Sequence, residues 1–170
     1  MSENFKNDLV TDLPDITKIR FKKIDKDYLK VILINFFLVF ILLFAGLIAL
    51  QQFAFSEAFS AYNPAIYFGF SSFFGLYLIY LLLAFPKKKY ALRDRDISYK
   101  SGLLFLKTTT VPFSRIQHVE TDEKPISRIF KLASLSVYTA GDSSDDLVIK
   151  GVKKQEALEI KEFISSKINA

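Results

Sequence analysis

The residues that could do chemistry are few, and the first to consider is His118, the single histidine of the chain. Ser114 precedes it by four residues and Glu120 follows it by two. A histidine base needs a nucleophile within reach and a carboxylate that orients its ring. In an extended strand, however, residues two apart merely share a face. We therefore interpret His118 as structural, and we predict no catalytic residue and no enzymatic activity.

A metal or cofactor site is not expected either. The chain has no cysteine, so thiolate ligands and disulfides are excluded. Asp142, Asp145 and Asp146 could bind a hard cation weakly, but they lack the spacing and the final Glu of a calcium-binding loop. A solvated turn is the favoured interpretation. The sequence also has no glycine-rich phosphate loop, nucleophile elbow or dinucleotide fingerprint. We predict no cofactor and identify no small-molecule substrate.

Basic residues gather after the second of two long apolar segments, and the net charge is +5. The candidates for contact with lipid or another surface are Lys87, Lys88, Lys89, Arg93, Arg95, Lys100 and Lys107. Their simplest role is to set membrane topology, and recognition of anionic head groups is the alternative, although both roles are compatible. Since a bilayer lies closer to these residues than any nucleic acid, lipid is the predicted partner and nucleic acid is not.

The apolar segments that would position these residues are 31–50 and 65–85. Each has about the 20 residues needed to cross the hydrocarbon core. Across 31–85 the only charged residue is Glu57. A chain of 170 residues is too short to cover two such helices with protein, and the first run is too long and too far from the start for a cleavable signal peptide. We predict a transmembrane hairpin over 29–85.

The distribution of Lys and Arg predicts how the hairpin is oriented. Basic residues precede the first segment and follow the second, whereas 51–64 contains neither Lys nor Arg. Both termini should therefore be cytoplasmic, in the cytoplasmic membrane of a bacterium. Residues 1–28 are expected to form a mobile cytoplasmic segment. Aromatic residues are expected at the two membrane boundaries: Phe53, Phe55, Phe59, Tyr62 and Tyr67 on the far side, Tyr28 and Tyr90 on the near side.

Small and polar residues suggest how the two helices contact each other. Ala45 and Ala49 in one helix, and Ser71 and Gly75 in the other, are four residues apart and would permit close approach. Asn35 is interpreted as a donor in a hydrogen bond between the helices. Neither segment contains Asp, Glu, His, Lys or Arg, so neither offers a path for ions or a charged substrate. Transport by this chain alone is therefore not expected.

Residues 86–170 change to short alternating runs bounded by turn residues, which predicts strands. The expected strands are 89–93, 96–101, 104–111, 116–123, 135–140 and 147–150. Residues 126–132 should form a short helical or irregular crossing, and 153–168 a closing amphipathic helix. The prediction is an α+β domain, a small antiparallel barrel or sandwich closed by its C-terminal helix.

Several motifs in this region resemble the bacterial pleckstrin-homology-like family of YdbS-type membrane proteins. The most specific are the block from Pro112 to Val119 and the Tyr-Thr-Ala-Gly run that ends at Gly141. The motif residues, interpreted as structural, are Pro112, Arg115, Ile116, Gln117, His118, Val119, Tyr138 and Gly141. The resemblance implies a strongly bent antiparallel sheet closed by a C-terminal helix, and little about activity. One departure is Lys131, where the family pattern usually has Gly.

These observations predict a membrane-anchored, non-enzymatic module that binds a partner protein or a second copy of itself. The alternatives are a domain that senses anionic lipid and an accessory subunit of a transport or envelope complex. Anchoring favours the first, because it raises the effective concentration of the domain at the membrane surface, so that weak contacts suffice.

Overall fold

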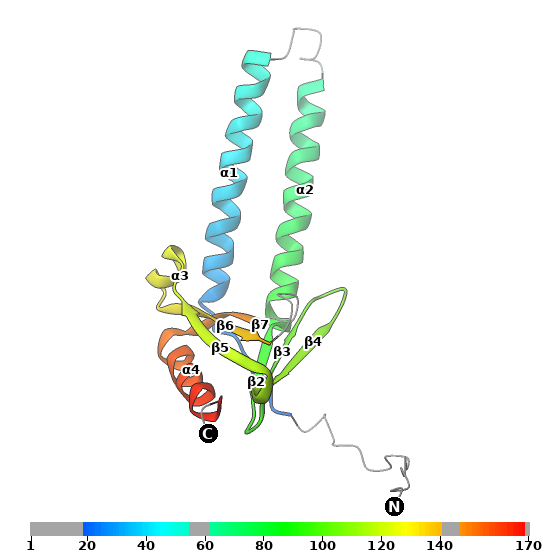
Figure 1. Cartoon of the computed structure of the whole chain (residues 1–170). Coiled ribbons are helices and arrows are strands. Elements are labelled where there is room, and N and C mark those ends of the chain that lie inside the picture. Colours follow the sequence, from blue (N-terminus) through cyan, green and yellow to red (C-terminus); the bar gives the residue numbers. More distant parts are fainter. Residues whose placement is uncertain (1–18, 55–61, 141–146, 169–170) are drawn as a thin grey trace, which may run out of the picture.

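Two long helices rise side by side from a compact β-rich domain (Figure 1). The computed structural model describes residues 19–54, 62–140 and 147–168. Helix α1 is Tyr28–Ala54 and helix α2 is Asn63–Ala84. Both are somewhat longer than predicted at their N-terminal ends. Pro64 lies in the first turn of α2, where its missing N–H is not needed, and the 3-10 turn η3 (Phe85–Lys87), which contains Pro86, follows the helix.

Aromatic rings fill the contact between the two helices. Phe36, Phe40 and Phe44 follow one another at four-residue spacing on α1, so they lie on one face. On α2, Phe70 and Phe74 pack between them, with centroids 5.2 Å apart for Phe40 and Phe74 and 5.8 Å apart for Phe44 and Phe70. Such tilted and edge-on ring pairs are favourable beyond the area they bury.

The predicted small-residue contact is therefore wrong. Ala45, Ala49, Ser71 and Gly75 are all exposed, and a Cβ added at Gly75 would meet no atom within 4 Å. Phenylalanine rings fill the contact between α1 and α2, so small residues do not mediate it. The interpretation of Asn35 is also wrong, because its Nδ2 donates to the Val31 carbonyl of its own helix at 2.7 Å.

The described part of the domain consists of two antiparallel sheets. The first has the order β1-β2-β3-β4 and comprises β1 (Lys22–Lys23), β2 (Lys89–Leu92), β3 (Asp96–Ser101) and β4 (Lys107–Pro112). The second has the order β5-β6-β7 and comprises β5 (Ile116–Asp122), β6 (Leu132–Thr139) and β7 (Leu147–Lys153). The short turn η4 (Phe113–Arg115) joins the sheets, α3 (Pro125–Ile129) crosses from β5 to β6, and α4 (Lys154–Ile168) closes the domain.

The hairpin is inserted between the first two strands of the domain. Strand β1 precedes α1 in the chain, and it pairs antiparallel with β2, which follows α2. Ile24 is 4% exposed and belongs to the domain core. This differs from the expected mobile segment, because residues 22–28 are held by strand pairing and by apolar burial. Residues 1–18 lie outside the described residues.

The core lies between the two sheets and α4. Ile97 from the first sheet, Leu135 and Ile149 from the second, and Ile164 from α4 have no exposed surface. Ala157, Ile160 and Ile164 place the apolar stripe of α4 against this core, as the helical spacing predicts. Tyr28 packs against the core and Tyr90 is 3% exposed within it, so neither forms the near-side aromatic belt that was predicted.

A strained residue lies between α3 and β6. Lys131 has a backbone φ of 54°, in the left-handed region that residues other than Gly rarely adopt. Its N–H donates to the Arg128 carbonyl at 3.1 Å, and its carbonyl accepts from Lys154 N–H at 2.9 Å, so hydrogen bonds on both sides hold the turn. The departure from the family pattern thus places a lysine where the backbone favours glycine.

We expect Lys131→Gly to stabilise the protein by about 0.5–1 kcal/mol, because relief of the left-handed strain exceeds the added entropy of the unfolded chain. The free energy of unfolding of the detergent-solubilised protein measures the effect. Lys131→Ala is the matched control, since it removes the same charge but keeps the strain. Equal stability of the two variants would contradict a conformational cause.

Candidate functional site

The hairpin and the domain meet at a close contact between Gly151 and the Tyr28 ring. Gly151 has φ +82° and is left unpaired in β7, because Ala133 pairs with Val152 whereas Ser134 pairs with Lys150. A glycine-containing bulge of this kind bends its strand. A Cβ at Gly151 would lie 2.6 Å from Cδ1 of Tyr28, and the Gly151 carbonyl accepts from Asp25 N–H at 2.9 Å. The first turn of α1 is therefore seated on β7.

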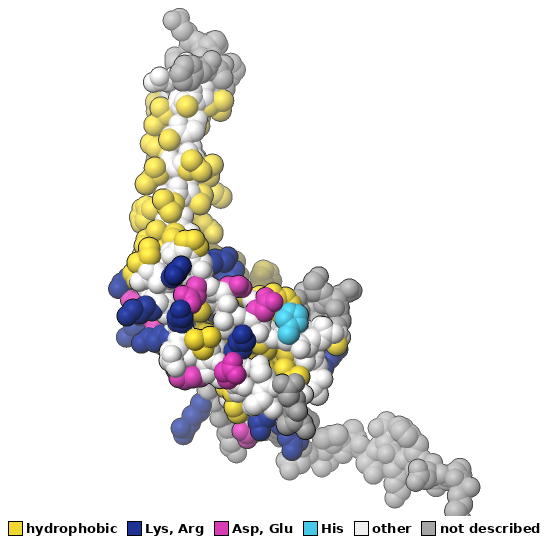
Figure 2. Space-filling model, turned by 60° about the vertical axis from the view of Figure 1, so that its left-hand side comes forward, with side chains coloured by type: hydrophobic (Ala, Val, Ile, Leu, Met, Phe, Trp, Pro, Cys, Tyr) yellow, Lys and Arg dark blue, Asp and Glu magenta, His cyan; other side chains and the backbone are white. Residues whose placement is uncertain are grey.

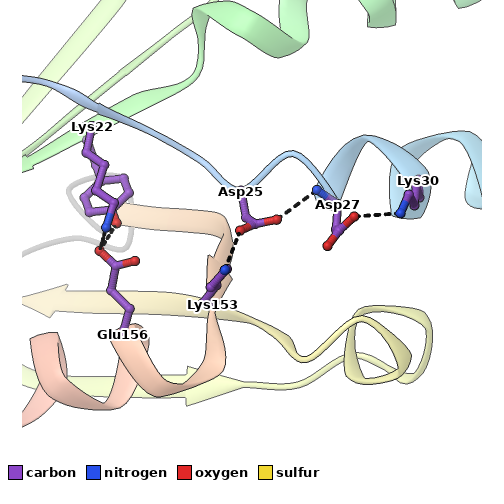
Figure 3. Close-up of polar contacts among 7 residues, drawn as sticks. Lys22, Asp25, Asp27, Lys30, Lys153 and Glu156 are labelled. Atoms are coloured by element: carbon purple, nitrogen blue, oxygen red, sulfur yellow. Dashed lines mark hydrogen bonds and ion pairs between the residues drawn. The ribbon is translucent and has the colours of Figure 1, made fainter.

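Polar contacts reinforce this junction (Figure 3). Lys22 from β1 forms an ion pair with Glu156 of α4 at 2.6 Å, and the Tyr90 hydroxyl donates to the same carboxylate. Asp25 accepts from Asp27 N–H at 2.8 Å and lies 3.7 Å from Lys153. Because these contacts join the segment before α1 to both β7 and α4, the hairpin has a defined direction relative to the domain.

The hydrogen bond from Lys30, 2.7 Å from Asp27 Oδ1, lowers the pKa of Asp27. Burial raises the pKa of Tyr99 to about 12, and it is the leading cause of the raised pKa of Tyr90, to which the hydrogen bond with Glu156 also contributes. The two tyrosines are opposite each other on β2 and β3. Both therefore remain protonated well above the range in which an exposed tyrosine ionises.

The predicted basic residues divide between two ends of the first sheet. Lys89 pairs with Lys100, and Lys107 pairs with Ser101, so these lysines lie at the end where β2 leaves the hairpin. Lys87 and Lys88 lie in the same connection. Arg93 and Arg95 are in the turn at the opposite end, and Arg93 forms a two-point contact with Asp96, with its Nε 2.7 Å from Oδ1. The predicted basic residues therefore do not form a single surface patch.

Strand register creates a row of lysines at the hairpin end. Lys23, Lys89 and Lys100 are register partners on three adjacent strands, so their side chains share one face. Like charges directly opposite each other are unfavourable. In the described part of the chain, no carboxylate lies within ion-pair distance of these three residues. We call Lys23, Lys89 and Lys100 the lysine row. From the sequence, Lys23 counts only among the basic residues before the hairpin that predict its orientation, and it is not among the predicted surface-binding residues.

Lys88 directly precedes Lys89 of the lysine row and is half-buried. Its ammonium lies 5.8 Å from the centroid of the Tyr28 ring. Burial lowers the pKa of Lys88, and the positive charge of Lys150 acts in the same direction. An anion near this group would therefore be favoured by two positive charges at once.

Sequence reasoning also missed an exposed apolar loop, because 104–111 was predicted as one strand. Strand β4 begins only at Lys107, and Leu104, Phe105 and Leu106 are 80%, 89% and 62% exposed. Gly102 has φ +107°, and a side chain there would collide with the Phe105 carbonyl, so the loop turns tightly. The available signal was the apolar run directly after Gly102, which does not alternate as a half-buried strand would.

His118 belongs to a surface cluster on the second sheet. Its ring stacks on Tyr138 with centroids 4.3 Å apart, and its Nε2 lies 3.7 Å from Glu120 Oε1. The Tyr138 hydroxyl donates to Glu120 Oε2 at 3.2 Å, and the charge of Glu120 raises the pKa of Tyr138. His118 and Glu120 share a face, as predicted. The cluster is a cross-strand contact between β5 and β6 at the surface.

The family motif forms the corner between the two sheets. Pro112 ends β4, and Ile116 and Val119 point into the core at 5% and 7% exposure. Arg115 and Gln117 are exposed, and the Arg115 carbonyl accepts from Ala140 N–H at 3.0 Å. Gly141 lies outside the described residues, as do Asp142, Asp145 and Asp146. Among the residues that are described, no group of three or more potential metal ligands is found.

Strand β4 has an open outer edge beside this corner. It is the last strand of its sheet, and within the described residues it pairs only with β3. A groove of about 380 Å³ follows the edge, lined by 107–112 of β4 and by Arg115 and Thr139 across it. Unpaired strand edges accept extended peptides through main-chain hydrogen bonds.

This architecture defines a class: a pleckstrin-homology-like domain with two apolar helices inserted near its start. The family model described as Bacterial PH domain matches residues 28–168. The chain therefore belongs to the bacterial PH domain family. This confirms the predicted resemblance and the predicted fold class of a helical hairpin followed by a bent antiparallel sheet and a closing helix.

Two relatives come from Bacillus subtilis strain 168. The transmembrane protein YdbS is 27% identical over 77 residues, which cover 45% of this chain and 46% of that protein. The transmembrane protein YdbT is 30% identical over 79 residues, which cover 46% of this chain and 16% of that protein. The chain thus matches less than half the length of each. A DUF1696 family protein with a pleckstrin-homology domain from Shewanella loihica PV-4 aligns over 48% of this chain and 70% of its own, with 19% identity and a TM-score of 0.37.

We expect Gly151→Ala to destabilise the protein by more than about 2 kcal/mol, because the added methyl group collides with Tyr28 at a left-handed position. The free energy of unfolding in detergent is the measurement. Gly46→Ala is the control, since a Cβ there meets no atom within 4 Å. In a double-mutant cycle with Tyr28→Ala, part of the loss should disappear; strict additivity would contradict a contact between the two residues.

We also expect stability to fall as the pH rises above the ordinary pKa of tyrosine, about 10. Between that value and the folded pKa of Tyr99, about 12, the unfolded state loses its proton while the folded state keeps it. Tyr99→Phe should flatten this decline, as measured by unfolding free energies at pH values below and within that window. Tyr62→Phe, outside the domain, is the control, and an unchanged slope in Tyr99→Phe would contradict the assignment.

Proposed function

We propose that the protein is a membrane-anchored, non-enzymatic interaction module, whose domain binds a partner protein at the cytoplasmic surface of a bacterial membrane. The first support is the hairpin. In the most apolar window of each helix only 11% of residues are buried, and the exposed hydrophobic side chains cover the hairpin along its length in Figure 2. Helices that are apolar all round and uncovered by protein require lipid as their solvent.

The position of the basic residues supports the proposed orientation. Lys26 and Lys30 flank the start of α1, and Lys87 and Lys88 follow α2, so these lysines lie at the domain end of the hairpin. The segment between the helices, 55–61, contains neither Lys nor Arg. By the positive-inside rule the domain and both termini face the cytoplasm.

The observation that carries the proposed binding function is the open edge of β4. The two end residues of β4 limit the length of edge that a partner strand can pair with. Lys107 places a charge at one end, and Pro112 has no backbone N–H to donate at the other. Thr108, Thr109, Thr110 and Val111 remain between them, enough for a short extended segment of a partner. The junction at Tyr28 fixes the direction of this edge, which lowers the ordering cost of binding.

A second copy of the chain is the alternative occupant of the same edge. Two β4 strands of this length would bring Lys107 of one copy toward the edge of the other, and the lysine would then have to remain solvated. A partner segment with a carboxylate opposite Lys107 or Arg115 fits the groove better, since both lining residues are cationic.

We expect a photoreactive amino acid placed at Arg115, which is exposed and lines the groove, to crosslink in intact cells to an extended segment of one protein. Mass spectrometry of the adduct identifies the segment, and an adduct of twice the chain mass indicates self-association. Thr108→Lys should abolish the adduct, because a lysine on a strand edge opposes strand addition.

The control is the same photoreactive group at Glu162, which is exposed on α4 away from the groove. Equal protein adducts at both positions would indicate collision with neighbours and would contradict an edge-binding site. An Arg115 adduct that persists in Thr108→Lys would do the same.

A further inference from the structure

We propose that the domain is itself seated in the bilayer, by an apolar loop and an apolar helix end that flank the base of the hairpin. The occupant of these apolar surfaces is the lipid interface, and the lysine row meets the phosphates of anionic head groups. The inference rests on the proposed membrane location of the hairpin and extends it from the helices to the domain.

The loop is the first element. Leu104, Phe105 and Leu106 form the tip of the β3–β4 hairpin, and more than half of each side chain is exposed. Figure 1 shows this tip rising toward the helices, level with the lower end of α2. Three consecutive large apolar residues at an exposed tip carry an unfavourable hydration cost in water that the interfacial region of a bilayer relieves.

Helix α3 is the second element, on the other side of the hairpin base (Figure 1). A cavity of about 410 Å³ between it and α1 is lined by Tyr28, Val31 and Asn35 from α1, and by Pro125 and Ile126 from α3. The helix therefore lies beside the first two turns of α1. Ile129, at its end, is 76% exposed, and the adjacent Phe130 ring lies 5.8 Å from the Lys30 ammonium.

The charges near the loop match a lipid surface. Lys100 lies two residues before Gly102, and Lys107 directly follows Leu106. Together with Lys23 and Lys89 they place four ammonium groups, none of which forms an ion pair with another described residue, near an apolar tip. Cationic groups beside exposed apolar side chains are the arrangement of an interfacial anchor. Each lysine near an anionic leaflet is attracted to it, and the attraction falls off within a Debye length. An uncharged protein surface would leave the lysine row uncompensated.

Two apolar contacts on opposite sides of the hairpin would prevent the domain from tilting. The junction at Gly151 already holds α1 against β7, so the loop and α3 act as further supports at separate points. The consequence is a fixed orientation in which the groove along β4 has a constant distance from the membrane.

The chain has no tryptophan, so a single substitution provides a unique fluorophore. Full-length Phe105→Trp and Ile129→Trp are reconstituted into vesicles of phosphatidylcholine and phosphatidylglycerol, with or without brominated lipids. The bromines lie near the head group for these two variants and near the centre of the bilayer for Leu42→Trp. Leu42→Trp, at a position 72% exposed in the middle of α1, reports hairpin insertion, and Leu158→Trp, 37% exposed on α4, reports the water-facing side.

We expect brominated lipid to quench F105W and I129W, with emission shifted to the blue relative to L158W, which should not be quenched. In F105W, Lys100→Gln should reduce the quenching, and vesicles of phosphatidylcholine alone should have the same effect. Quenching of L42W without quenching of F105W and I129W would overturn the seating while leaving the membrane location intact. Absence of quenching in L42W would overturn the membrane location itself. Blue-shifted emission of F105W without quenching would assign the loop to a protein contact and overturn the proposed lipid contact.

Discussion

The pairing of β1 with β2 is the constraint on which the rest of the architecture depends. These strands are separated in the chain by the entire hairpin, yet Lys22 pairs with Tyr90 and Lys23 with Lys89. Paired strands lie about 4.8 Å apart, so the pairing brings the base of α1 and the base of α2 together. The helices are thus an insertion within the domain, and two chain segments connect the domain to the hairpin.

This arrangement explains why the junction is so well packed. A domain attached by one flexible linker would need no contacts with its anchor. Here Ile24 lies in the core, the Tyr28 ring packs against Gly151, and the backbone N–H of Asp25 donates a hydrogen bond to the Gly151 carbonyl. A glycine bulge at β7 makes room for the tyrosine ring, so backbone conformation and helix direction are coupled through one contact.

The domain has different chemistry at its two ends. At the hairpin end the lysine row has no ion pair with any described residue and an apolar loop is exposed, whereas at the opposite end Arg93 forms an ion pair with Asp96. Residues that suggested chemistry in the sequence have a different explanation: His118 stacks on Tyr138, and the motif around Arg115 forms a corner. The candidate binding features are therefore the groove along β4, the lysine row and the exposed apolar loop. Membership of the family alone does not identify the partner that binds to any of them.

Local pattern by itself determined most of the elements. Continuous apolar runs predicted the two long helices, and the alternating and amphipathic patterns predicted β2, β3, β5 and α4 to within one residue of their observed bounds. Strand β4 begins three residues later than predicted, β6 begins three residues earlier, and β7 ends three residues later. The tertiary structure decided what depends on register and on contacts between distant segments. The pairing of β1 across the hairpin, the lysine row and the burial of Tyr90 all join residues whose neighbours are far away in the chain. The contact between the phenylalanine rings of α1 and α2 also could not be predicted from the positions of small residues. The rotation of each helix about its axis decides which face meets the partner helix, and this rotation is set by packing rather than by composition.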